Sequence, residues 1–235
     1  MQGMLAIIHT TPVTIEPLKR LAEELLPGCR VMNVMDDSIL PELAANGGDV
    51  GAVRERLCKY AEFAERQGAR VILSACSSVG ELVDDMRRSV TAPVVRIDEP
   101  MAERAVRAGE RIGVAATAAT TVAPTLSLLK RKAAEAGRDV AIEPMVAEDA
   151  YRLLLAGDRE GHDASLGAAL LTLAGRCDVV VLAQASMARV VEALPEAARD
   201  RFLSSPRLGM ELARERLREA SADAATDVSN AYPAE

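Results

Sequence analysis

The stretch Val71-Ile72-Leu73-Ser74-Ala75-Cys76-Ser77-Ser78 joins an apolar run to a short polar turn. The apolar run is of a length and composition typical of a buried strand. Ser78 and Glu81 have the spacing of a capping box, which predicts that a helix begins directly after the turn. Cys76 is therefore expected at a strand-to-helix junction.

A thiol at this junction is placed for chemistry. The positive end of a helix dipole and the unpaired backbone N–H groups both favour thiolate over thiol, and a thiolate is a nucleophile or a base toward carbon. The alternative is that Cys76 is a small apolar residue of the core, since free cysteine is among the most buried residue types. The rest of the chain favours the chemical role.

Short apolar runs alternate with longer segments of helical periodicity on both sides of this stretch. This alternation predicts parallel strands covered by helices, which is a doubly wound α/β architecture. The segment from Ala222 to Glu235 is polar and rich in small residues, and is expected to be frayed. Strands are predicted at 5–8, 30–34, 71–75, 94–97, 112–115, 140–144 and 179–183, and helices at 15–26, 53–67, 79–88, 101–108, 121–136, 147–155, 163–175, 187–194 and 208–220.

Two of the predicted strands recur later in the chain at nearly one offset. Leu5–Thr10 is similar to Ile112–Thr117, 107 positions later, and Val71–Cys76 is similar to Val179–Gln184, 108 positions later. Apolar strands can look alike by chance, but near-equal offsets and the polar residues that follow favour a true duplication.

The repeat predicts two pseudo-symmetric doubly wound parallel-sheet halves with the ligand cleft between them, because open sheets bind ligands at the carboxyl ends of their strands. The first half is expected to comprise residues 1–98 with a returning C-terminal helix over 207–235, and the second residues 99–206.

Composition excludes several classes of protein. With 28 basic and 35 acidic residues the chain carries a net charge of −7, and only 2% of its residues are aromatic, so neither a nucleic acid nor a membrane is an expected partner. The N-terminus lacks the pattern of a signal peptide and no apolar stretch is long enough to span a membrane. The four cysteines form no C-x-x-C pair and lie at no zinc-ligand spacing from a histidine, so they are expected to be reduced thiols in a cytoplasmic protein.

Together these motifs resemble the aspartate/glutamate/hydantoin racemase superfamily. The resemblance extends from Leu5 to about Leu212 and implies two pseudo-symmetric α/β halves, each of which contributes a catalytic cysteine after a strand in the racemases. It also implies that Thr117 and Thr120 hold a substrate carboxylate. The stretches that carry it are Ala75-Cys76-Ser77-Ser78, Ile112-Gly113-Val114-Ala115-Ala116-Thr117-Ala118-Ala119-Thr120 and Ser204-Ser205-Pro206-Arg207.

The chain departs from this family at the second cysteine. Leu182-Ala183-Gln184-Ala185-Ser186-Met187 is similar to the stretch that holds that cysteine in the hydantoin racemases, and Gln184 stands in its place. An amide has no accessible pKa and cannot exchange a proton with carbon. Cys177 lies seven residues earlier, before the strand, and cannot replace it. The chain therefore resembles a one-cysteine variant.

The candidate site residues lie at or just after predicted strand ends. Cys76 is the candidate catalytic residue, and His162 is expected to be a solvated loop residue. Each threonine has turn or cap chemistry as its alternative role, and His9 and Gln184 each have a structural one. Asp98 and Glu99 are expected either at the rim of the cleft or in solvent. The candidate substrate-binding residues are His9, Thr10, Thr11, Ser77, Ser78, Thr117, Thr120, Gln184, Ala185 and Ser186.

These features predict a cofactor-independent isomerase, racemase-like, that acts on the carbon next to a carboxylate or carbonyl of a small acid, in amino-acid metabolism. One alternative is a single-cysteine decarboxylase or lyase of the same superfamily, and another is a non-catalytic relative that binds a small acid. The expected substrate is a small carboxylate or a hydantoin-like compound. No nucleotide-binding motif is present, so no cofactor or metal is expected. A homodimer or higher homo-oligomer is compatible with a chain of this kind.

Overall fold

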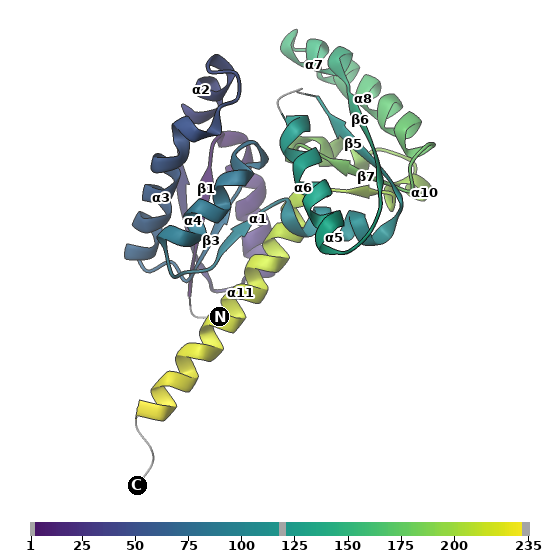
Figure 1. The fold of residues 1–235 in the computed structure, drawn as a ribbon. Helices are drawn as coiled ribbons and strands as arrows, with labels where there is room; N and C mark the ends of the chain where they lie inside the picture. Colours follow the sequence, from purple (N-terminus) through teal and green to yellow (C-terminus); the bar gives the residue numbers. More distant parts are fainter. Residues whose placement is uncertain (1–2, 118–120, 232–235) are drawn as a thin grey trace. The chain divides into compact units, whose positions relative to one another are not determined.

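The structure, a computed structural model, describes residues 3–117 and 121–231, with side chains described as far as residue 222. The chain divides into two compact units (Figure 1). The first unit extends to Ile97 and also includes the chain from Pro206 onward, and the second unit is Asp98–Ser205.

The first unit contains a four-stranded parallel sheet in the order β2-β1-β3-β4. Its strands are β1 (Met4–His9), β2 (Arg30–Met35), β3 (Val71–Ser74) and β4 (Val94–Arg96). Its helices are α1 (Ile15–Leu25), α2 (Ile39–Ala45), α3 (Arg54–Arg66), α4 (Val83–Ser89) and α11 (Ser205–Ala231), and its 3-10 turns are η1 (Pro12–Thr14), η2 (Val50–Val53) and η3 (Ser77–Leu82).

Helices cover both faces of this sheet because β1 is apolar from Met4 to Ile8. Leu5 and Ile7 point to the face that packs against α1 and α11, whereas Ala6 and Ile8 point to the face covered by α2, α3 and α4. All four side chains are buried. A strand buried on both faces reads as a continuous apolar run, as parallel strands generally do.

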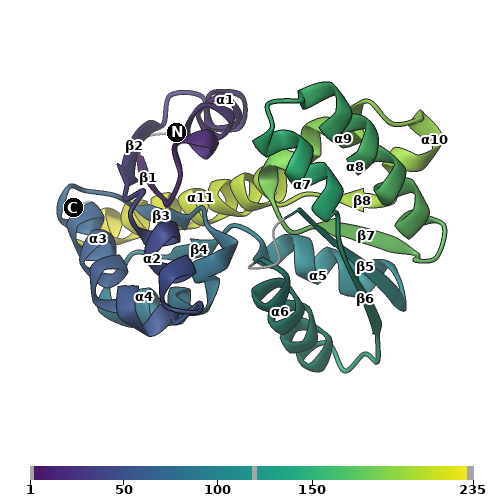
Figure 2. The ribbon, with the colours of Figure 1, turned by 90° about the horizontal axis from the view of Figure 1, so that it is seen from above.

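The second unit repeats this architecture with the order β6-β5-β7-β8, again with all strands parallel (Figure 2). Its strands are β5 (Arg111–Ala116), β6 (Ala141–Val146), β7 (Val179–Leu182) and β8 (Phe202–Leu203). Its helices are α5 (Glu99–Ala108), α6 (Val122–Glu135), α7 (Glu148–Leu155), α8 (Arg159–Ala174), α9 (Ala188–Glu192) and α10 (Glu196–Arg199), and the 3-10 turn η5 (Ala185–Met187) follows β7.

The strand register shows that the two units are copies of one plan. Leu5 of β1 pairs with Val71 of β3, and Ile112 of β5 pairs with Val179 of β7, so the sequence repeat corresponds to equivalent pairs in the two sheets. The predicted fold class, α/β with two pseudo-symmetric doubly wound parallel-sheet halves, is confirmed.

Several local predictions were wrong. The helix predicted at 79–88 is a 3-10 turn followed by α4, and the helix predicted at 187–194 is likewise η5 followed by the short α9. The segment predicted to be frayed continues α11 as far as Ala231, because its many alanines favour a helix. The short elements α2, α10 and β8 carry too few residues for a recognisable periodicity. No helix within the described residues is both long enough and apolar enough to cross a membrane.

Candidate active site

Cys76 lies at the carboxyl end of β3, in the extended residue that precedes η3. On the neighbouring strand, Ile8 pairs with Ser74, and the N–H of Ala75 donates to the carbonyl of Ile8 at 2.9 Å. Two residues further along each chain, Thr10 and Cys76 therefore reach the same edge of the sheet. Both are buried, with 2% and 9% of their surface exposed.

Four polar groups lie around the thiol of Cys76, and burial opposes its ionisation. The backbone N–H groups of Ser78 and Val79 and the hydroxyls of Thr10 and Ser78 lie close enough to Sγ to lower the pKa of the thiol. Burial raises the pKa of the Cys76 thiol, and the four polar groups lower it by less, so the net pKa is raised. The groups at the turn thus favour the thiolate, as expected from the sequence, but desolvation of the charge outweighs them.

The predicted capping box is also wrong, for a reason that matters to the site. Ser78 lies inside η3 and caps no helix, and α4 begins only at Val83. Cys76 occupies the residue before the 3-10 turn, and its side chain makes no cap hydrogen bond. Because the N–H groups of the first two residues of a 3-10 turn have no partner within the turn, that of Ser78 remains available to the sulfur.

The hydroxyl of Thr10 is the least satisfied polar group at this strand end. Thr10 Oγ1 is close enough to Cys76 to lower the pKa of the thiol, yet it has no hydrogen-bond partner within the described part of the chain. A buried hydroxyl in this state costs about 1–3 kcal/mol. A ligand oxygen or a Cys76 thiolate would relieve that cost.

The adjacent residues differ in how they meet the site. Ser77 is half-buried in η3, and Thr11 is half-buried where it precedes η1. The carbonyl of Thr11 accepts a hydrogen bond from the Thr14 hydroxyl at 3.1 Å. This bond closes a turn at Thr11 and leaves the Thr11 side chain partly exposed.

His9 is fully buried within the first unit. Its Nδ1 lies 2.8 Å from Thr14 Oγ1 and its Nε2 lies 2.9 Å from Asn33 Oδ1. Burial lowers the pKa of His9, against a smaller opposing effect of the Asn33 hydrogen bond, so the neutral ring is favoured. With both ring nitrogens engaged, the geometry favours the structural alternative for His9, as the anchor of the η1 turn.

Gln184 occupies in the second unit the place that Cys76 has in the first. It follows β7, precedes η5 and has φ −132° and ψ 131°, against −134° and 115° for Cys76. Its Oε1 accepts the backbone N–H of Thr117 at 2.7 Å and the Thr117 hydroxyl at 2.9 Å. The two donors that the family resemblance assigns to a substrate carboxylate are thus bound to the Gln184 amide.

The other candidates of the second unit lie near Gln184 or outside the described residues. Ala185 is half-buried and Ser186 is exposed, both in η5. Thr120 lies outside the described residues. The second-unit site that the structure describes therefore consists of the Thr117–Gln184 pair and the turn that follows it.

The sequence interpretation overlooked Arg96. This side chain at the end of β4 is only 2% exposed and takes part in a polar interaction. Its guanidinium fills the space beside Gly80, where an added Cβ would lie 2.3 Å from Arg96 Cζ. The sequence feature that could have pointed to Arg96 is an arginine within a short apolar strand, three residues before Glu99.

His162 is not the solvated loop residue that was predicted. It lies in α8, is buried, and its Nδ1 is 2.7 Å from Asp163 Oδ1. Asp163 also pairs with Arg189 of α9, and this ion pair with the arginine lowers the pKa of Asp163 to about 2. The helical pattern begins at Arg159, earlier than the sequence suggested, because Asp158 caps the helix by accepting the N–H of Gly161.

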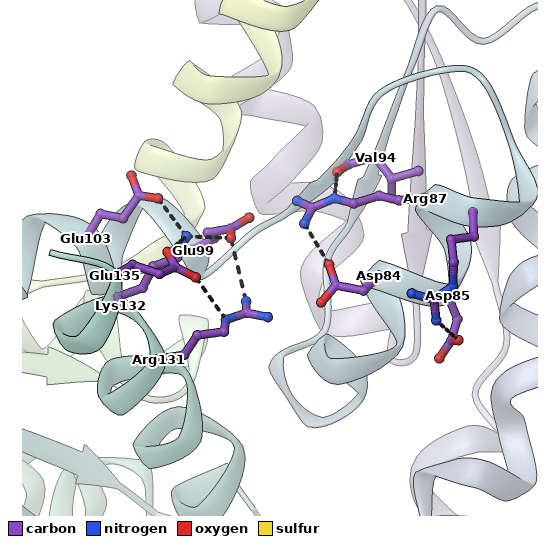
Figure 3. A network of polar contacts seen from close by, with 10 residues as sticks. Asp84, Asp85, Arg87, Val94, Glu99, Glu103, Arg131, Lys132 and Glu135 are labelled. Atoms are coloured by element: carbon purple, nitrogen blue, oxygen red, sulfur yellow. Dashed lines mark hydrogen bonds and ion pairs between the residues drawn. The ribbon is translucent and has the colours of Figure 1, made fainter.

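Asp98 and Glu99 are both buried, so their expected solvated alternative is wrong. Glu99 lies in a network of α5 and α6, where Lys132 Nζ contacts Glu99 at 2.7 Å, Glu103 at 2.9 Å and Glu135 at 3.0 Å (Figure 3). Burial works against the charge of Lys132, but the three carboxylates together raise its pKa. This cluster fastens α5 to α6. Among the described residues, no group of three or more acidic, histidine or cysteine side chains is arranged to hold a metal ion.

A family model described as Asp/Glu/Hydantoin racemase matches residues 7–213. The chain belongs to this family. The match includes both strand-end sites described above, with Cys76 at one and Gln184 at the other.

Several solved structures share the fold at low sequence identity. A glutamate racemase isoform from Bacillus anthracis is 16% identical, with a TM-score of 0.71, over 92% of this chain and 82% of that one. An aspartate racemase homologue from Pyrococcus horikoshii is 17% identical, with a TM-score of 0.69, over 93% and 99%. A cysteine-bearing mutant of an arylmalonate decarboxylase is 16% identical, with a TM-score of 0.53, over 93% of each chain. No curated protein sequence matches the chain.

Proposed function

We propose that this family member is a cofactor-independent, racemase-like isomerase that moves a proton on the carbon next to a carboxylate or carbonyl of a small acid, with Cys76 as its acid–base group. The observation that carries the proposal is the Thr10 hydroxyl, which has no hydrogen-bond partner among the described residues and lies beside a thiol that two backbone N–H groups also approach. Donors with no other partner around a buried reactive group are suited to an oxyanion.

In the forward step, the Cys76 thiolate takes the proton from the α-carbon and becomes a thiol. The electron pair of the broken C–H bond moves into the neighbouring carbonyl or carboxylate, which becomes an enolate or enediolate. A non-cysteine donor then delivers a proton to the opposite face of this planar intermediate and forms the new C–H bond, and Cys76 regains its thiolate by losing its proton to water. The N–H groups of Ser78 and Val79 stabilise the sulfur in its charged state.

The resting thiol limits this reaction and favours a second candidate function. Because burial raises the pKa of Cys76, the protonated form is the abundant one and is ready to donate. In a decarboxylase, a malonate-type acid loses carbon dioxide and its C–C electron pair forms an enediolate, which takes the proton of the Cys76 thiol. Water then reprotonates the thiolate. One cysteine suffices for this lyase reaction.

The proposed substrates are small carboxylates or hydantoin-like compounds. Ser77, Ser78 and Thr11 would contact the substrate beside Cys76. Thr117 would offer its donors to a carboxylate only after the Gln184 side chain has turned away, since Gln184 Oε1 holds both of them. The free thiols at Cys29, Cys58, Cys76 and Cys177 suit a reducing, cytoplasmic setting.

The test is solvent exchange in deuterated water with a panel of aspartate, glutamate, hydantoins and substituted malonates. Deuterium at the α-carbon without loss of carbon dioxide supports the isomerase, and deuterium that accompanies carbon dioxide release supports the decarboxylase. Cys76→Ser is the decisive variant and Cys58→Ser, at a half-buried thiol outside the site, is the control. Full turnover by Cys76→Ser would refute both. Binding of a panel compound with neither exchange nor decarboxylation would indicate a binding protein.

A further inference from the structure

The guanidinium of Arg96 occupies the space in which a side chain at position 80 would begin. A Cβ added to Gly80 would lie 2.3 Å from Cζ, 2.4 Å from Nε and 2.6 Å from Nη2 of Arg96. Real Cβ atoms do not approach other atoms so closely, so any other residue at position 80 would require the guanidinium of Arg96 to move. Both residues are buried.

Gly80 belongs to the same 3-10 turn that supplies the donors to Cys76. It directly follows Val79, and its carbonyl accepts the N–H of Val83, which closes the last turn of η3. A shift of Gly80 therefore moves the N–H groups of Ser78 and Val79 relative to Cys76 Sγ.

Arg96 is itself held firmly by the sheet. It pairs with Ser74 in the register of β3 and β4, and the N–H of Ile97 donates to the carbonyl of Ser74 at 3.1 Å. Ser74 is two residues before Cys76, so Arg96 extends from the strand next to the catalytic candidate to the turn that follows it. A buried guanidinium needs a polar partner, and Arg96 has one.

We propose that Arg96 is a positioning residue, which packs against Gly80 and thereby holds the η3 turn where the N–H groups of Ser78 and Val79 meet the Cys76 sulfur. Hydrogen bonds weaken steeply once the donor points away from the acceptor, so a small displacement of the turn costs the thiolate its stabilisation. A guanidinium is planar and rigid and can fill the space beside a glycine, whereas a lysine ammonium is a point charge on a flexible side chain.

The experiment measures the rate of Cys76 alkylation by iodoacetamide against pH, with each cysteine resolved by peptide mass spectrometry. Arg96→Lys keeps the positive charge and removes the planar guanidinium. We expect it to raise the pH midpoint of Cys76 alkylation by about half a unit to one unit, because the N–H groups then donate more weakly to the sulfur. Arg88→Lys is the matched control, because Arg88 is an exposed arginine of α4 in the same unit. It is expected to leave the midpoint unchanged.

Gly80→Ala tests the contact directly. We expect Gly80→Ala to raise the pH midpoint of Cys76 alkylation strongly when residue 96 is arginine. In the Arg96→Lys background the effect should be much smaller, since the lysine side chain can move away from the new methyl group. Gly3→Ala is the control, because a Cβ there meets only ordinary contacts at 3.6 and 3.8 Å. Folding of Gly80→Ala only in the Arg96→Lys background would also support the contact.

An unchanged midpoint in a folded Arg96→Lys chain would overturn the inference, as would an equal effect of Gly80→Ala in both backgrounds or a failure to fold in both. If Arg96→Lys itself does not fold, an unchanged midpoint in folded Gly80→Ala overturns it. The inference rests on the proposed function only for its consequence in catalysis. Full turnover by Cys76→Ser would refute that function and leave the alkylation result standing.

Discussion

The strand ends after β3 and β7 have the same backbone and different chemistry. Cys76 and Gln184 both sit in an extended residue between a strand and a 3-10 turn. In the first unit Thr10 directs an unpartnered hydroxyl to a thiol, whereas in the second unit Thr117 gives both of its donors to Gln184. The first strand end is unsatisfied and the second is satisfied internally.

The repeated fold thus keeps equivalent positions at the two strand ends but carries a different functional group at each. An amide oxygen accepts two neutral donors well and needs no ionisation. A buried thiol accepts them only at the cost of a raised pKa. The unit that carries the amide thus provides an acceptor for both donors of Thr117.

The largest expected effect concerns proton exchange on a panel substrate. Cys76→Ser should lower the exchange rate by about 10³-fold, since general acid–base groups contribute roughly 10²–10⁴-fold. Gln184→Glu, which keeps an acceptor for Thr117, should lower it by about tenfold or less. Equal losses in the two variants would mean that Cys76 and Gln184 contribute equally to catalysis, and would contradict a difference in chemistry between the two strand ends.

The next effect concerns the reactivity of the thiol. Because burial raises the pKa of Cys76 above its usual value of 9.0, iodoacetamide at neutral pH should modify Cys76 at least about tenfold more slowly than in the chain unfolded by urea. The rate should still be rising at alkaline pH. A midpoint near neutrality would show instead that the donors of the turn prevail over burial.

Removal of the Gln184 amide should destabilise the second unit. Gln184→Ala leaves the N–H and hydroxyl of buried Thr117 without their acceptor, which should cost about 1–3 kcal/mol in the free energy of unfolding by urea. Gln184→Glu is the control, because its carboxylate keeps both bonds. An unchanged unfolding free energy in Gln184→Ala would show that Thr117 finds other partners.

The two threonines should respond in opposite directions to the same isosteric change. Thr117→Val removes a hydroxyl bonded to Gln184 and should cost about 1 kcal/mol. Thr10→Val removes a buried hydroxyl that has no partner and should be neutral or stabilising by up to about 1 kcal/mol. Paired urea titrations check this, and a clear destabilisation by Thr10→Val would indicate that its hydroxyl is satisfied.

The smallest effect is the pH dependence due to His9. Burial lowers the pKa of His9 from 6.5, so below that pH the unfolded chain binds a proton that the folded chain does not. Stability is therefore lost as the pH falls toward the folded-state pKa. His9→Asn should show a flatter profile of unfolding free energy between about pH 7.5 and pH 5. Identical profiles would mean that other groups cause the decline.

Much of the fold could be predicted from local patterns. The apolar runs of β1, β3, β5 and β7 are buried on both faces, so they stand out from the helical segments around them. The repeat of these strands revealed the two halves, and the family motif placed Cys76 after β3. The local patterns did not predict the 3-10 turns that follow β3 and β7. Ser78 has the sequence spacing of a helix cap but lies inside such a turn.

The site could be predicted only in part. The positions of Thr10, Cys76, Thr117 and Gln184 follow from strand ends, but their partners depend on which groups the neighbouring strands bring alongside. Arg96 shows the same limit, because its contact with Gly80 joins two strand ends separated in sequence by a helix. No short-range pattern encodes that contact.

The amino-acid sequence was enough to predict an α/β chain of two halves. It also predicted a thiol after one strand and an amide after the strand that repeats it. Side-chain identity and hydrophobic periodicity suffice for that. The packed structure shows in addition that burial raises the pKa of the thiol, that Thr117 is bound to Gln184 and that the Thr10 hydroxyl has no hydrogen-bond partner among the described residues. These properties depend on desolvation and on distances of a few ångströms between residues far apart in the chain, and both arise when the sheets and helices pack.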